Sequence, residues 1–173
     1  MVSFVGYETS GLPVMRSNRG SLYSLPVINA YRLDTRDRPG LLFAMMRMFA
    51  SDHSHIAFEG YLATTELYRL EGAAYEETSV LKRATTAPLL DFVVLPLVPA
   101  RIPEVEKAIC SKVAFGGYRG IIHVQIEANG KLAFGAYDNF NPDTVTVYGP
   151  IEKAALDDLV ARRTLRSYAQ RQS

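Results

Sequence analysis

The chain has 173 residues, of which 48% are hydrophobic, and its 19 Lys and Arg residues nearly balance its 18 Asp and Glu residues. This length and composition suffice for one folded domain with a sizeable core, and they exclude an extended disordered chain. The net charge of +1 creates no field that attracts nucleic acid, and no apolar run approaches the roughly 20 residues that cross a bilayer. We therefore expect no nucleic acid and no membrane among the partners.

The cellular setting is predicted from the N-terminus and the cysteine content. Residues 1–7 have neither the basic start nor the apolar run of a secretory signal. The single cysteine, Cys110, excludes an internal disulfide and is interpreted as a small buried residue of a helix. Together these features predict a cytoplasmic location.

The first part of the chain is predicted to contain an arm, a strand and a helix. Residues 1–24 are rich in Gly, Ser, Asn and Arg, which is typical of an N-terminal arm, whereas 25–34 alternate as a strand. Asp37 is placed to cap the following helix, with Pro39 at its first position. The apolar stripe of this helix is predicted to contain Leu41, Leu42, Met45, Met48 and Phe49.

Two further strands and a helix are expected next. Residues 56–63 alternate as a strand that we expect to pair beside the first. The segment 64–90 is less regular and is interpreted as an insertion that contains a short helix. Residues 91–98 form an apolar strand in which Pro96 indicates a bulge or a sheet edge, and Pro103 begins the second helix.

The C-terminal segment, 128–173, is predicted to be an added hairpin and helix. A strand over 122–127 leads into Asn129-Gly130, the strongest hairpin signal in the chain, and the return strand covers 131–137. A short strand at 145–148 precedes the last helix, whose basic end carries Arg162, Arg163 and Arg166.

The order of these elements favours an α+β fold of the ferredoxin-like type. In that arrangement, two βαβ units form a mostly antiparallel sheet with the helices on one face. The chain then divides into the arm, 1–24, and a single domain, 25–173.

The sequence from Val27 to Ile56 resembles the ACT domain, a small regulatory module that binds amino acids in many metabolic enzymes and transcription regulators. The resemblance rests on the order of a strand, Asp37-Arg38-Pro39-Gly40-Leu41-Leu42, a helix with Phe49-Ala50, and a second strand entered at Ile56. It extends more weakly to about residue 127. The fold implied is therefore an ACT-like variant of the ferredoxin-like sheet.

The resemblance implies a ligand between the strand–helix loop and the second strand of a neighbouring copy. Free N–H groups and the positive end of a helix suit a carboxylate there. The implied contacts are Asp37, Arg38, Pro39 and Gly40 in the loop and Ile56, Ala57 and Phe58 on the strand.

Two features depart from the ACT pattern. Where the family ends its first helix with glycine and a short Asn-Ile entry, this chain has Asp52-His53-Ser54-His55-Ile56, which predicts a different turn. The insertion 64–90 and the extension 128–173 are also foreign to the minimal module.

Other chemistry in the sequence is weaker. Asp52, His53 and His55 are the densest group of candidate metal ligands, because two imidazoles one residue apart can share a metal in an extended segment. A polar turn with solvated histidines is the preferred interpretation. The glycine-rich segment 115–120 and the loop 138–143 are interpreted as connections, so we assign no catalytic residue, no metal and no cofactor.

Three functions follow from this sequence. The first is a non-enzymatic, ACT-like protein that binds a small metabolite such as an amino acid, or that associates with another protein and forms a homodimer. The alternative is a dedicated partner-binding protein, such as an immunity protein or an inhibitor. The third is a metal-dependent enzyme that uses Asp52, His53 and His55.

Overall fold

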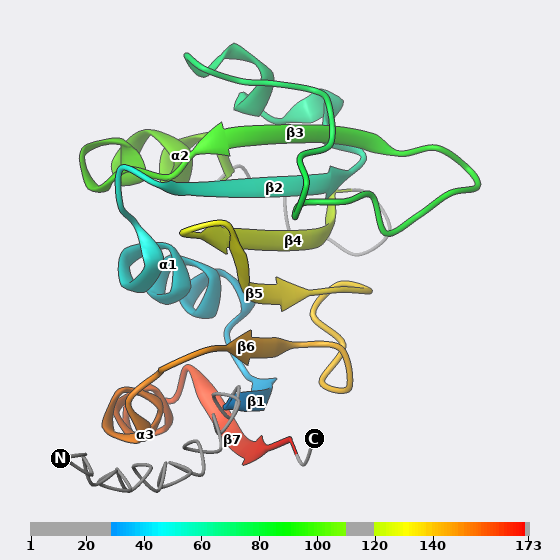
Figure 1. Cartoon of the computed structure of the whole chain (residues 1–173). Coiled ribbons are helices and arrows are strands. Elements are labelled where there is room, and N and C mark those ends of the chain that lie inside the picture. Colours follow the sequence, from blue (N-terminus) through cyan, green and yellow to red (C-terminus); the bar gives the residue numbers. More distant parts are fainter. Residues whose placement is uncertain (1–28, 110–119, 172–173) are drawn as a thin grey trace, which may run out of the picture.

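The computed structural model describes residues 29–109 and 120–171, and this part of the chain is an α+β protein with one open antiparallel sheet (Figure 1). The predicted arm, Cys110 and most of the glycine-rich segment lie outside the described residues. The described connections contain three short 3-10 turns, Leu62–Thr64, Leu67–Arg69 and Pro99–Arg101. The helices and strands are β1 (Ala30–Thr35), α1 (Arg38–Phe49), β2 (Ser54–Gly60), β3 (Asp91–Pro96), α2 (Ile102–Ile109), β4 (Ile121–Ala128), β5 (Lys131–Ala136), β6 (Thr146–Tyr148), α3 (Lys153–Ala161) and β7 (Leu165–Gln170).

The strand order differs from the one we expected. The seven described strands follow the order β3-β2-β4-β5-β6-β1-β7, and every neighbouring pair is antiparallel. The prediction that the second strand pairs beside the first is therefore wrong, because β4, β5 and β6 stand between β1 and β2. The α+β class is confirmed, whereas the ferredoxin-like topology is not.

The described strands form two split βαβ units, which lie in separate parts of the sheet. Strands β3 and β4 flank β2 and are joined through α2, while β6 and β7 flank β1 and are joined through α3. Because both outer strands of each unit run opposite to the central one, they are parallel to each other. The segment 128–173 thus supplies strands inside the sheet and at its edge, and it is not an appendage.

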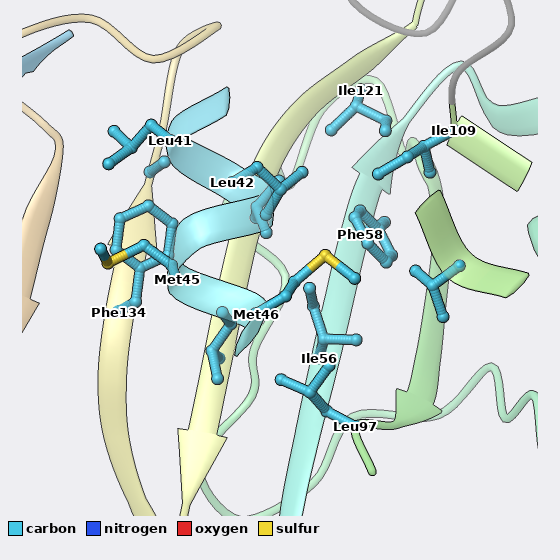
Figure 2. Packing of buried hydrophobic residues seen from close by; sticks show 14 of the residues in the cluster. Leu41, Leu42, Met45, Met46, Ile56, Phe58, Leu97, Ile109, Ile121 and Phe134 are labelled. Carbon is cyan, nitrogen blue, oxygen red and sulfur yellow. The ribbon is translucent and has the colours of Figure 1, made fainter. Parts of the chain in front are cut away.

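The two faces of the sheet have different cores. Ile56 and Phe58 belong to the main apolar cluster, which also contains buried residues of all three described helices, whereas Ala57 belongs to a second cluster. Since successive residues of a strand point to opposite faces, the helices cover one face and the second cluster lies on the other. Figure 2 shows the main cluster, with Met45 beside Phe134 and Met46 directed toward Ile56 and Phe58.

Helix α1 begins and packs largely as the sequence predicts. The Asp37 side chain accepts a hydrogen bond from the Gly40 N–H at 3.0 Å, which confirms the cap, although Pro39 is the second helical residue. The apolar stripe needs one correction: Met46 is fully buried, whereas Met48 is 36% exposed. Both are apolar positions of one helix, so the sequence pattern could not choose between them.

The connection between β2 and β3 forms no helix in its second half. The two 3-10 turns come directly after β2, and residues 71–90, hereafter the strap, contain neither helix nor strand. Leu81 of the strap is fully buried in the second apolar cluster with Ala57, Phe92 and Val94. Figure 1 shows this long green connection beside the β2 and β3 end of the sheet.

The C-terminal half confirms the hairpin and corrects the last element. Asn129 and Gly130 have φ values of 52° and 73°, as a tight hairpin turn requires. The last helix ends at Ala161, and Arg163, with φ at 62°, leads into the strand β7 that was not predicted. Among the described residues, none of the helices has the length and apolarity to traverse a membrane.

The burial of the two methionines gives the first prediction. Met46→Ala should lower the free energy of unfolding by about 2–5 kcal/mol, because it leaves a cavity in the main core. Met48→Ala is the matched control on the same helix and should cost less than about 1 kcal/mol. Urea denaturation measures both, and equal losses would contradict the placement of α1.

Candidate functional site

The loop implied by the ACT resemblance is occupied by groups of the chain itself. The Asp37 carboxylate binds the Gly40 N–H, and the N–H groups of Arg36 and Asp37 donate to the Thr164 carbonyl at 2.9 and 3.3 Å. The Thr35 hydroxyl donates to that same carbonyl at 3.0 Å. A bound carboxylate would have to displace the Asp37 side chain, which already carries a negative charge at the helix N-terminus.

The facing strand of that implied site lies in a different part of the sheet. Asp37 and Arg38 are exposed and Pro39 and Gly40 partly exposed at the start of α1. The residues Ile56, Ala57 and Phe58 are at most 2% exposed in the centre of β2, between β3 and β4. Within one copy the structure therefore does not bring the loop and the strand together.

The histidine cluster after α1 is open and polar. Asp52 and His53 are exposed and His55 is partly exposed at the start of β2. Across the described ranges, 29–109 and 120–171, no group of three His, Cys, Asp or Glu side chains is arranged to hold a metal ion. His123 does not join them, because it pairs with Glu59, four residues further along β2 than His55.

The structure gathers a buried polar cluster that the sequence did not indicate. Glu59, His123 and Gln125 are 1%, 5% and 4% exposed, and all three point to the sheet face opposite the helices. They meet the strap there. The Glu59 carboxylate accepts hydrogen bonds from the N–H groups of Ala84 and Thr85 at 2.6 and 2.9 Å.

The other two side chains complete the contact with the strap. The Gln125 side chain accepts from the Lys82 N–H at 3.2 Å and donates to the Lys82 carbonyl. The Thr85 hydroxyl lies 2.9 Å from Nε2 of His123. Within the described part of the chain, no buried side-chain nitrogen or oxygen lacks a partner, so the cluster is fully satisfied.

The hydrogen bonds fix the tautomer of His123. The Asp138 N–H donates to Nδ1 at 3.2 Å, so this nitrogen carries no proton. The neutral ring must then carry its proton on Nε2 and donate it to the Thr85 hydroxyl. A histidine in this state cannot accept the hydroxyl proton of Thr85, and the pair is not arranged as a base and a nucleophile.

Burial sets the protonation of the cluster. Burial lowers the pKa of His123, and the negative charges of Glu59 and Asp138 oppose this effect only in part. Burial also raises the pKa of Tyr137, whose ring centroid lies 5.7 Å from that of His123. Both groups are therefore held neutral.

A left-handed turn presents the Asp138 N–H to His123. Asp138, Asn139 and Phe140 have φ values of 50°, 58° and 60°. L residues rarely adopt this left-handed conformation at three consecutive positions. The turn is held by the Asn139 N–H, which donates to the Ile122 carbonyl at 2.9 Å, and by burial of the Phe140 side chain. The loop 138–143, which the sequence indicated only as a connection, thus supports the cluster.

The sequence carried little signal for this cluster. Glu59, Thr85 and His123 are far apart along the chain, and the two strand residues follow the ordinary polar alternation of a solvent-facing side. Contact with the strap, together with Tyr137 and Asp138 next to His123, covers that side. Comparisons with protein-family models, curated proteins and solved structures gave no match to this chain, so the resemblance to the ACT domain stays a prediction.

The helix cap at Asp37 can be tested by a double-mutant cycle. Asp37→Ala should lower the free energy of unfolding by about 1 kcal/mol through loss of the cap. Gly40→Ala should also destabilise, because its Cβ would lie 2.2 Å from Oδ2 of Asp37. In the Asp37→Ala background the same change should be neutral or stabilising, since alanine favours helix by up to about 1 kcal/mol. Additive losses in urea denaturation would contradict this contact.

His123 predicts a dependence of stability on pH. Because its pKa is lowered in the folded state, the unfolded chain binds a proton more readily. The stabilisation is complete above the ordinary pKa of about 6.5, and it is lost as the pH falls toward the lowered value. Melting temperatures measured between about pH 7 and pH 5 should fall less for His123→Gln than for the wild type. His53→Gln, at an exposed position, should behave as the wild type, and parallel curves for all three proteins would refute the assignment.

Proposed function

We propose that the protein acts without catalysis, by associating with a second protein chain through the outer edge of β7, and that it forms a homodimer in this way. The proposal develops the protein-association branch of the sequence hypothesis. The observation that carries it is the unequal protection of the two sheet edges. An unprotected strand edge is a template for pairing with another chain.

One edge of the sheet is closed. β3 is the first strand in the order, and Ala74 pairs with its outer side through two hydrogen bonds to Val94, at 2.9 and 2.8 Å. Pro96, which cannot donate a main-chain hydrogen bond, ends the same strand. These features are typical of an edge that avoids pairing.

The other edge is open in the described part of the chain. β7 is the last strand in the order, and no described strand pairs with its outer side. The Leu33 N–H donates to the carbonyl of Val145, just before β6, and the Arg171 N–H donates to the Ala30 carbonyl, which sets the alternation of bonds along β1 and β7. By that alternation, Tyr168 and Gln170 direct their main-chain groups away from β1.

The edge is compatible with a second copy of itself. An antiparallel pair centred on Tyr168 places Arg166 of one copy opposite Gln170 of the other, so like charges do not face each other. Arg166 is also paired within its own chain, 3.1 Å from Asp34. The outward N–H and carbonyl groups of the two copies then satisfy each other.

Proline at position 170 tests the proposal. Gln170→Pro removes one outward N–H from each copy, and two lost bonds of about 1 kcal/mol each should weaken the dimer roughly 30-fold. Gln170→Ala is the matched control, because it removes the same side chain and keeps the N–H. Sedimentation equilibrium measures the dissociation constants, and circular dichroism checks the fold.

Two results would reject the proposal. The first is a wild-type protein that stays monomeric at every concentration tested, and the second is a dimer that Gln170→Pro and Gln170→Ala affect equally. A monomer that pairs with a different protein, sensitive to Gln170→Pro alone, would instead support the dedicated partner-binding function.

A further inference from the structure

We propose that the sheet face formed by β2, β3 and β4 is a docking site for an extended peptide segment of a partner protein, and that the strap occupies this site in the isolated chain. The proposal is independent of the β7 edge. It rests on the contacts of the strap, which are main-chain hydrogen bonds together with a few side-chain contacts, as in protein–peptide complexes.

The strap is recognised chiefly through its main chain. Gln125 binds both the N–H and the carbonyl of Lys82, and Glu59 binds the N–H groups of the residues at 84 and 85. The side chains of Lys82 and Ala84 are exposed. Contacts of this kind place few demands on the sequence of the segment that is bound.

A few side chains supply specificity. Leu81 is the anchor and is buried with Ala57, Phe92 and Val94 in the second apolar cluster. Two residues later, the Arg83 guanidinium lies 4.8 Å from the centre of the Phe92 ring, a favourable cation–π contact. Four residues after the anchor, the Thr85 hydroxyl accepts from His123. The site thus fits an apolar residue, an arginine at the second following position and a serine or threonine at the fourth.

The face beneath the strap is suited to being uncovered. Glu59, His123 and Gln125 are polar groups that water can solvate when the strap leaves, whereas a purely structural cover is expected to bury apolar side chains. Leu81 is the one strap residue in the second apolar cluster, and Leu90, at the end of the strap, is the strap's other buried apolar side chain. Opening the strap therefore exposes three polar side chains beside the apolar residues that pack against Leu81.

The occupant is argued to be a partner protein and not a second copy. The strap is tethered beside its site, so its effective concentration reaches the millimolar range for a short linker. An identical strap from another copy has no advantage over it. A partner segment displaces the strap only if its anchor or its arginine and hydroxyl residues fit better.

Binding of a labelled peptide to the full-length protein tests the site. The peptide copies residues 76–90, and the host protein carries Leu81→Asp, which weakens its own strap and leaves the face intact. This host should bind the peptide at least about tenfold more tightly than the wild type, because the competing strap is released. Adding Gln125→Ala to the host, or Ala84→Pro to the peptide, should abolish that gain. The first removes the side chain that binds the Lys82 main chain, and the second removes the N–H that donates to Glu59.

Hydrogen exchange of the wild-type protein gives a second test that needs no variant. The N–H groups of Ala84 and Thr85 should exchange through local opening, well before those of the central strand β4. Exchange of both regions only through global unfolding would overturn the proposal. So would a folded Leu81→Asp host, checked by circular dichroism, whose peptide binding equals that of the wild type or is unchanged by Gln125→Ala. A dimer dissociated by Leu81→Asp and not by Gln170→Pro would overturn the choice of partner in favour of strap exchange.

Discussion

The short strand β6 is the connection on which the rest of the sheet depends. It has three residues, and its ladder to β5 is the pairing that joins the unit around β1, to which β6 belongs, to the rest of the sheet. So short a strand contributes few hydrogen bonds, and the units must also be joined by packing. Helix α1 provides this, because it follows β1 in the chain and places Met45 against Phe134 of β5 (Figure 2). The buried side chain of Val147 in β6 belongs to the same cluster.

Local features of this fold were predictable from the sequence, whereas strand order was not. The cap at Asp37 and the turn at Asn129-Gly130 depend on residues that are neighbours in the chain. The partners of β1 depend on segments more than a hundred residues away, and alternation along a strand does not say which other strand lies beside it. The basic residues after Ala161 illustrate the same limit, since their charges suited a helix end while Leu165–Gln170 pairs as β7.

The candidate sites also divide into a local part that the sequence predicts and a long-range part that it does not. The sequence correctly places Asp37 and Gly40 together, because a cap is local, but the hydrogen bonds to Asp37 and Thr164 leave that loop largely satisfied. Glu59 and His123 read as ordinary polar positions of two strands. Their burial follows from the strap, whose position over the second face is a long-range contact. Nothing in the local pattern of residues 71–90 indicates which face it will cover.

The polar cluster also explains why the strap can be ordered without regular secondary structure. A buried carboxylate is costly unless hydrogen bonds replace its water, and Glu59 obtains them from two N–H groups that the strap itself would otherwise leave unpaired. Sheet and strap therefore satisfy each other, and when the strap opens, water must replace the hydrogen bonds of both. A second proton on His123 affects a neighbouring contact: on Nδ1 it excludes the hydrogen bond from Asp138, whereas Nε2 still donates to Thr85 of the strap. Acid should then weaken the contact between β4 and the loop 138–143, while β7, towards the other end of the strand order, keeps its pairing with β1. The two proposed surfaces share the sheet but no hydrogen bond, so occupation of one leaves the other available.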